Sequence, residues 1–330
     1  MTLPRRRFLH LAAGAAALPA VSRAAWSQSY GAQSYPARPV RLVVQVPAGS
    51  APDIIARVMA DWLSERLRQQ FVVDNRPGAS GNIATEAVIR APADGYSLLL
   101  AMSANAINAS LFDNLRFNFS RDTAPVASIA SIPLALEINP SVPAKTVPEL
   151  IAHAKANPGK LNVASTGNGT PLHVAAELFK MMAGVNLVHV AYRGEPVAIP
   201  DLISGQVQVM FGVLPSALPY IRSGQVRALA VTTTTRQDVL PGVPALDEFL
   251  PGYEASGWYG IAAPKDTPAE IVDKLNREVN AGLADPNTRQ RLADLGCLIF
   301  AGSPTDFARF VAGESEKWAK VVRAAGLTAE

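Results

Sequence analysis

The feature that most constrains the fold is a repeated alternation of short β-branched runs with segments of helical periodicity. Residues 40–46 read VRLVVQV, which is typical of a buried strand, and apolar residues recur at helical spacing over 53–67. The same pattern predicts strands at 71–73 and 96–102 and a helix ending near Ile89. Strands that alternate with helices require crossover connections, so we expect an α/β fold with parallel, doubly wound sheets.

The pattern restarts after Pro140, which indicates a second α/β unit in the same chain. Capping boxes are expected at Thr267–Glu270 and Ser303–Asp306 in a helical C-terminal tail. Two such units place a cleft between them, and ligands bind such sheets outside the carboxyl ends of the strands. The second unit is expected to contain strands at 161–164, 187–190, 207–211 and 226–231 and helices at 147–156, 171–183, 197–204 and 215–222.

Charge and composition exclude several classes of function. Apolar residues make up 49% of the chain, which argues against disorder, and the formal net charge is +3. Much of that charge comes from Arg5, Arg6, Arg7 and Arg23. Without these four arginines, 26 of the 30 basic residues remain against 27 acidic ones, a net charge near −1. A nucleic-acid partner is therefore not expected.

The N-terminal segment is typical of an export signal. A basic start is followed by a short apolar stretch, Phe8–Val21, and small residues then surround a cleavage site expected near Ala24 or Ala25. The alternative is a disordered basic arm, which the apolar stretch disfavours. We therefore expect a signal peptide at 1–25, a leader at 26–35 and a periplasmic location.

The route of export is suggested by the run RRRFL at Arg5–Leu9, which resembles a twin-arginine signal. Pro4 stands where Ser or Thr often precedes the arginines of that signal, so general secretion stays open. No later run has 18 consecutive apolar residues, and we expect the mature protein to be soluble.

Three loops that follow predicted strands offer an anion site, because free N–H groups at a helix N-terminus attract carboxylates. They are 47–53, 102–108 and 164–173. The third, ASTGNGTPLH, combines two glycines and three hydroxyls immediately before a helix, but it matches neither a Walker loop nor GxGxxG. For each loop the alternative is an ordinary capped turn, with Ser50 as the cap of the first.

Catalytic interpretations find little support. The three histidines of the body, His153, His173 and His189, are too scattered for a close ligand pair, and Asp53 alone is more typical of a helix cap. Cys297 is the only cysteine, which excludes an intrachain disulfide, and without an evident base it is expected to be a buried thiol. We expect no catalytic residue, no metal and no cofactor.

From about Tyr35 to Gly326 the chain resembles the Bug, or TctC-like, extracytoplasmic solute receptors of tripartite tricarboxylate transport systems. The resemblance implies a periplasmic binding protein, type II-like, with a hinge and a ligand cleft between domain 1 (36–133 and 257–330) and domain 2 (134–256). It is carried by nine runs in order: YPARPVRLVVQVPAG, VVDNRPGASGNIA, ADGYSLLL, NPGKLNVASTGNGTPLH, HVAYRG, DLISGQVQVMF, VRALAVTTTTR, PGVPALDE and WYGIAAPKDTPAEIVDKLN.

The family binds small carboxylates through backbone amides and hydroxyls, and its domains close over the ligand. The resemblance implies a monomer that serves membrane permease subunits; a sensor that signals to a membrane partner is the alternative. An enzyme or a transcriptional effector domain on the same fold is disfavoured. The ligand-binding residues it implies are Ala48, Gly49, Ser50, Asp53, Ser103, Ala104, Asn105, Ser165, Thr166, Gly167, Gly169, Thr170, His173, Tyr192, Arg193, Gly194, Phe211 and Gly212.

Two departures from the family pattern bear on the ligand. Where the family usually has Pro-Pro-Gly-Gly, this chain has Pro-Ala-Gly-Ser at 47–50, and where an Asp commonly follows Met-Phe it has Gly212. An acid at that position would pair with a ligand amine or a water. Its loss leads to the hypothesis that the ligand has no amino group.

Overall fold

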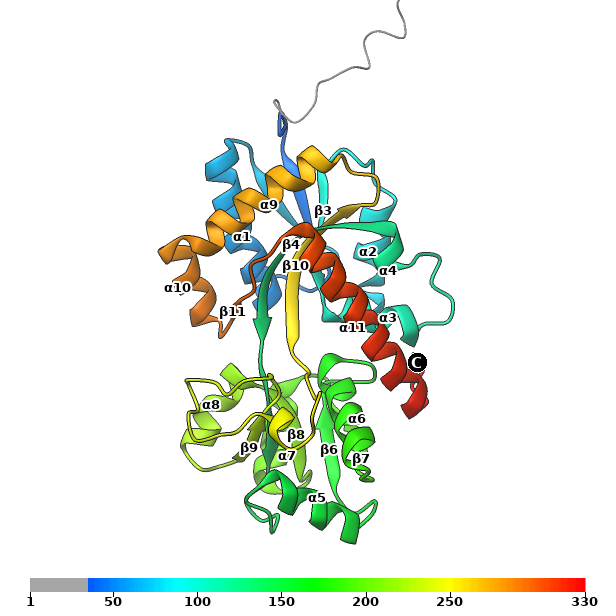
Figure 1. Cartoon of the computed structure of the whole chain (residues 1–330), viewed down its shortest axis with the longest axis vertical. Coiled ribbons are helices and arrows are strands. Elements are labelled where there is room, and N and C mark those ends of the chain that lie inside the picture. The colour runs from blue at the N-terminus through cyan, green and yellow to red at the C-terminus, as the bar shows by residue number, and fades with distance from the viewer. Residues whose placement is uncertain (1–34, 330) are drawn as a thin grey trace, which may run out of the picture. The chain divides into compact units, whose positions relative to one another are not determined.

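The computed structural model of the chain describes residues 35–329 (Figure 1). Residues 36–329 of this part belong to one compact unit that contains two β-sheets. The expected signal peptide, its cleavage site and nearly all of the leader lie outside the described residues. No helix in the described part of the chain is both long and apolar enough to cross a membrane.

The first sheet has six strands in the order β11-β4-β10-β3-β1-β2. Strand β1 pairs in parallel with β2 and β3, whereas β10 runs antiparallel to both β3 and β4, and β11 runs antiparallel to β4. The strands are β1 (Val40–Val44), β2 (Phe71–Asn75), β3 (Ser97–Met102), β4 (Thr123–Ile132), β10 (Gly257–Pro264) and β11 (Leu298–Ile299).

The second sheet has five strands in the order β7-β6-β8-β5-β9. Strand β6 pairs in parallel with β7 and β8, whereas β5 runs antiparallel to β8 and β9. The strands are β5 (Leu134–Ile138), β6 (Asn162–Ser165), β7 (Val188–Ala191), β8 (Val209–Val213) and β9 (Arg227–Val231).

Both sheets are therefore mixed, and the expectation of purely parallel sheets is wrong. The antiparallel members β4, β5 and β10 were missed because they carry the chain between the sheets rather than through a strand–helix repeat. Strand β4 passes through Pro133 directly into β5, and β10 returns the chain to the first sheet beside β4 (Figure 1). Thr232 joins the two passages: its amide donates to the Leu134 carbonyl (2.9 Å), and its carbonyl accepts from Ala255 N (3.1 Å).

The helices of the first sheet form two packed groups. One contains α1, α9 and α10, and the other contains α2, α3, α4 and α11. Their bounds are α1 (Ala51–Leu67), α2 (Asn82–Ile89, preceded by the 3₁₀ turn η2, Ala79–Gly81), α3 (Ser103–Leu111), α4 (Phe119–Asp122), α9 (Ala269–Ala284), α10 (Pro286–Asp294) and α11 (Pro304–Ala325).

The second sheet is covered by α5 (Val147–Ala156), α6 (Pro171–Ala183), α7 (Glu195–Ser204) and α8 (Leu214–Arg222), and the 3₁₀ turn η3 (Leu246–Glu248) precedes the return strand. The bounds of α5 and α6 match the predicted ones because Thr146 and Thr170 cap them, each accepting a hydrogen bond from the amide three residues on. Helix α11 packs against α3 and also against α6, so it touches helices of both sheets.

Three predicted caps have different outcomes. The capping box at Ser303 and Asp306 is confirmed. The box at Thr267 is wrong, because α9 begins after Pro268 without a side-chain cap; the hydroxyl of Thr267 donates to the Pro264 carbonyl. Ser50 precedes α1 but makes no cap bond either, because its hydroxyl donates to the Pro47 carbonyl.

Candidate functional site

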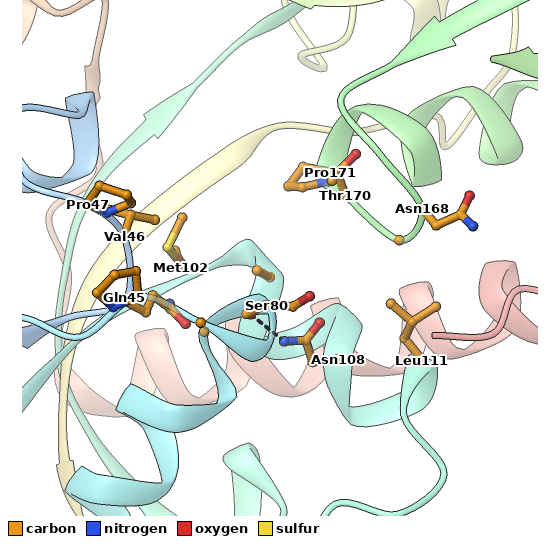
Figure 2. A pocket seen from close by; sticks show the side chains of 15 residues that line it. Gln45, Val46, Pro47, Ser80, Met102, Asn108, Leu111, Asn168, Thr170 and Pro171 are labelled. Atoms are coloured by element: carbon orange, nitrogen blue, oxygen red, sulfur yellow. Dashed lines mark hydrogen bonds between the residues drawn. The ribbon is translucent and has the colours of Figure 1, made fainter. Parts of the chain in front are cut away.

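A cavity of about 300 Å³ lies where loops of the first sheet face the loop that precedes α6 (Figure 2). The loops that follow β1, β2 and β6 contribute, as does helix α3, which follows β3 directly, so the cavity lies outside the carboxyl ends of parallel strands. The lining residues are Gln45, Val46, Pro47, Pro77, Gly78, Ser80, Gly81, Met102, Ala104, Asn108, Leu111, Asn168, Gly169, Thr170 and Pro171.

The polar groups of the cavity are neutral. Among the described residues that line it, none has a charged side chain, and the polar ones are amides and hydroxyls. Three helices also begin at its wall, since α2 follows Gly81, Ala104 belongs to the first turn of α3, and α6 starts at Pro171. Helix N-termini carry partial positive charge, so this wall favours an anion without a counter-charged side chain.

The wall between β2 and α2 has a strained backbone. Four consecutive residues have positive φ: Gly78 (130°), Ala79 (46°), Ser80 (54°) and Gly81 (90°). The left-handed region costs a non-glycine residue roughly 1–2 kcal/mol, so this turn persists only because its surroundings hold it. Asn108 is one such support, because its Nδ2 donates to the Ser80 carbonyl at 2.8 Å (Figure 2).

A buried amide network supports the same turn from below. Nε2 of Gln45 donates to Oδ1 of Asn105 (2.8 Å), and Nδ2 of Asn105 donates to the Thr85 hydroxyl (2.8 Å). The Thr85 hydroxyl in turn donates to the Gly81 carbonyl (2.9 Å). A Cβ added at Gly81 would overlap Oε1 of Gln45, so glycine is needed there both for φ and for space. We call Gln45, Thr85, Asn105, Asn108 and the turn 78–81 the first-sheet network.

The loop 164–173 closes the cavity from the second sheet and is held by its own hydrogen bonds. The Gly167 amide donates to the Ser165 hydroxyl (3.1 Å), and the Thr170 hydroxyl donates to the Gly167 carbonyl (2.8 Å). The Gly169 amide donates to Nδ1 of His173 (3.1 Å). The loop thus enters the cavity with a fixed shape.

Two stacked histidines lie behind this loop. The rings of His173 and His189 are 3.6 Å apart at 9°, and Nε2 of His189 shares a 2.6 Å hydrogen bond with the Ser165 hydroxyl. Burial, with the neighbouring His173 adding to it, lowers the pKa of His189 to about 4, so that ring is neutral at neutral pH. Nε2 of His173 lies 3.5 Å from Oε1 of Glu177, which is an electrostatic contact without hydrogen-bond alignment.

Of the residues predicted to bind ligand, only Ala104, Gly169 and Thr170 are among those lining the cavity. Several others hold the lining in place from behind. Asp53 accepts from the Gly49 amide, from Asn75 and from Arg57, and so fixes the loop before α1. Burial alone would raise the pKa of Asp53, but these bonds, Arg57 first, lower it below its usual value. The predicted residues outside the lining are Ala48, Gly49, Ser50, Asp53, Ser103, Asn105, Ser165, Thr166, Gly167, His173, Tyr192, Arg193, Gly194, Phe211 and Gly212.

Residues 192–194 and 211–212 are not among the lining residues, although the Tyr192 amide donates to the Ser165 carbonyl (2.9 Å) of the 164–173 loop. The Tyr192 hydroxyl donates to Asp201 (2.8 Å), Arg193 is exposed, and Phe211 is buried in the core against Phe179 and Tyr253. Burial, with Asp201 nearby, raises the pKa of Tyr192 to about 12.

The place of the acid missing at Gly212 is filled from another strand. A Cβ at Gly212 would overlap Oε1 of Glu137 on β5, and Oε1 of Glu195 would lie 3.5 Å from it. Burial, reinforced by the nearby Glu195, raises the pKa of Glu137 well above its usual value, and burial also raises the pKa of Glu195. A carboxyl is therefore present beside Gly212, and burial disfavours its charged form.

The three loops predicted as anion sites contain eight of the lining residues, and the other seven lie outside them: Gln45, Val46, Pro77, Gly78, Ser80, Gly81 and Leu111. The run NRPGASG at 75–81 carried a signal in its two glycines, but by itself it predicts only a turn before a helix. The thiol of Cys297 is buried, as expected, and burial raises its pKa to about 12. Within residues 35–329 no group of three or more His, Cys, Asp and Glu side chains could hold a metal ion.

Comparisons with known proteins place the chain among solute receptors. Protein BugT of Bordetella pertussis is 36% identical over 298 residues, which cover 89% of this chain and 91% of BugT. A structure described as R. palustris Rpa4515 with adipate is 37% identical, with a TM-score of 0.75 over 89% of this chain and 99% of that one. MatC of Rhodopseudomonas palustris with bound malate is 31% identical, with a TM-score of 0.73 over 87% and 100% of the two chains.

These neighbours confirm the expected solute-binding fold, and receptors rather than enzymes make up the matching family. Residues 55–327 match the model described as the tripartite tricarboxylate transporter family receptor. That match covers most of the chain, and the chain belongs to this receptor family.

Proposed function

We propose that the protein is an extracytoplasmic receptor that captures a small organic carboxylate in the cavity between the 78–81 turn and the 164–173 loop. The observation that carries the proposal is a cavity with neutral donors and three helix N-termini but no charged side chain among its described lining residues. Such a wall stabilises an anion through partial charges and hydrogen bonds. The adipate and malate held by two similar proteins support the same ligand class.

Capture would involve closure of two lobes about the passages between the sheets. We propose the division 36–133 with 257–330 and 134–256, because Pro133 and the segment before β10 connect the sheets and Thr232 ties these connections together. Closure excludes water from the cavity, and the hydrogen bonds to the carboxylate then gain strength.

Within the site, the lining residues would contact the ligand, and most of the other predicted residues would position them. Asn168, Ser80 and Thr170 supply polar side chains at the cavity. Asp53, Asn105, Ser165 and His173 hold the loops that carry the lining. Because none of the described residues that line the cavity has an acidic side chain that could pair with an amine, we retain the hypothesis of a ligand without an amino group.

The cellular role follows from the family. We propose that the chain is exported through the segment 1–25, is released into the periplasm as a monomer, and delivers its ligand to membrane permease subunits. The periplasmic neighbours support the location. A membrane sensor in place of a permease is the alternative partner.

The experiment is a thermal-shift screen of the purified protein against carboxylates, with alkyl amines as the matched control. A carboxylate at about 100 times its dissociation constant adds roughly 2.7 kcal/mol of stability, which raises the melting temperature visibly. Asn168→Ala should weaken the best acid about two- to tenfold, since it removes one neutral hydrogen bond. Asn287→Ala, an exposed asparagine outside the cavity lining, should leave that affinity unchanged. Stabilisation by amines but by no carboxylate would overturn the proposal.

A further inference from the structure

One contact in the cavity joins the end of helix α3, from the first sheet, to the loop before α6, from the second sheet, without any space between them. Gly169 and Leu111 both line the cavity, and a Cβ added at Gly169 would overlap Cδ2 of Leu111. Figure 2 shows the loop before α6 lying over the Leu111 side chain. The contact therefore forms an end wall, and a ligand that extends past it would have to displace leucine or part the two loops.

Leu111 has little freedom to move aside. It is the last residue of α3, it is 4% exposed, and its carbonyl accepts a hydrogen bond from the Ala329 amide (3.1 Å). Helix α11 packs along α3 and also touches α6, so the C-terminal segment supports the helix that carries Leu111. Close packing of this kind makes the size of a side chain matter at the level of single methylene groups.

The walls leading to this contact are mostly apolar. Val46, Pro47, Met102 and Pro171 line the cavity together with Leu111, and its described lining has no charged side chain that would pair with a polar substituent. Such walls suit an aliphatic ligand body.

We propose that Leu111 is a specificity-determining residue that sets the chain length of an aliphatic carboxylate by closing the cavity against Gly169. This inference rests on the proposed function. It adds that the acid is aliphatic and names the residue that selects its chain length. An acid with more methylene groups than the cavity holds meets Leu111, whereas a shorter one leaves apolar surface unfilled.

The test compares affinities for unbranched dicarboxylates and monocarboxylates of increasing length, measured by calorimetry on the wild type and on Leu111→Ala. The variant removes three carbon atoms from the end wall, so its preferred acid should be longer than that of the wild type. Each methylene newly accommodated should tighten binding about fourfold. Leu275→Ala, a buried leucine of α9 outside the cavity lining, is the matched control and should keep the wild-type length preference.

A double-mutant cycle measures the coupling between Gly169 and Leu111 apart from any other effect of a change in the loop. Gly169→Ala should lose affinity because its Cβ overlaps Leu111, and Leu111→Ala in the same chain should restore much of it. The strain of alanine at φ +67° is common to both backgrounds and cancels in the cycle. Leu111→Val gives a smaller shift of the same sign and serves if Leu111→Ala does not fold.

An unchanged length preference in every folded Leu111 variant would overturn this inference while leaving a carboxylate receptor in place. A loss of affinity in Gly169→Ala that Leu111→Ala does not restore would also overturn it. A wild type that binds amines but no acid of the series would instead overturn the proposed function, and the inference with it.

Discussion

The two sides of the cavity are built from different chemistry. The first-sheet network, defined by Gln45, Thr85, Asn105, Asn108 and the turn 78–81, contains amides and hydroxyls alone. The polar groups behind the second-sheet loop include His173, His189, Glu177 and Lys180, which are ionisable. The first-sheet network therefore depends on packing and neutral hydrogen bonds, although the ion pair of Asp53 and Arg57 holds the neighbouring loop before α1, whereas the support of the second-sheet loop also depends on protonation. Two walls of one site can therefore respond to different perturbations.

The largest expected loss of stability comes from replacing a glycine, because the two sides differ in how much space surrounds their glycines. Gly81→Ala should destabilise the protein by about 3 kcal/mol or more, because the Cβ overlaps buried Gln45 in addition to the cost of positive φ. Gly167→Ala, with φ of +127° but its nearest contact at 3.7 Å, should cost only the backbone strain, about 1–3 kcal/mol. Urea unfolding measures both losses of stability, and equal losses would contradict the expected difference between the two sides.

The next loss of stability should come from removing side-chain hydrogen bonds on each side of the cavity. Asn105→Ala should cost about 2–4 kcal/mol, because it leaves Gln45, Thr85 and the Met102 amide without their buried partner. Ser165→Ala should cost about 1–2 kcal/mol, since it removes only the bonds to Gly167 and His189. Chemical unfolding at neutral pH compares them. A larger loss for Ser165→Ala would show that the second-sheet loop, rather than the first-sheet network, carries more of the stability.

A smaller effect should appear at Glu137, which lies on the second sheet beside Gly212. Its pKa is raised by burial and then by Glu195, so the folded state holds a proton that the unfolded state releases once the pH exceeds about 4.5. The stability from this group is thus present at low pH and is lost as the pH rises toward the folded pKa. Glu137→Gln should therefore become more favourable relative to wild type as pH increases. Unfolding measured between pH 5 and pH 8 tests this, and a constant difference would contradict it.

The smallest effect at neutral pH should be the titration of His189, which changes stability only as the pH falls. Its pKa is about 4 in the folded state against 6.5 as the ordinary value, so the unfolded state binds more protons between those two values. Stability from this group is present above about pH 6.5 and declines as the pH falls toward 4. His189→Gln should flatten that decline, whereas Asn105→Ala should leave its slope unchanged. A flattened slope in Asn105→Ala and not in His189→Gln would reverse the assignment of pH sensitivity.

The two sides also differ in how far the sequence could predict them. The loop 164–173 was predicted together with its cap Thr170 and the helix after it, because all of its signals are local. The turn 78–81 was not predicted as part of the site, because its positive φ values are maintained by Gln45 and Asn108, which are distant in the chain. The strands β4, β5 and β10 were missed for a similar reason, since their role depends on passage between sheets. The Glu137 carboxyl beside Gly212 depends on strand pairing, which no single segment reveals.

The measurement that tests the central claim most directly is a crystal structure of the protein with the acid that stabilises it most in the thermal-shift screen. We expect a carboxylate within hydrogen-bond distance of lining residues from both sides, with Ser80 or Asn108 on one and Asn168 or Thr170 on the other. The aliphatic body should extend toward Leu111. An acid bound outside this cavity, for example in the separate hollow beside Cys297 and Leu298, would contradict the account.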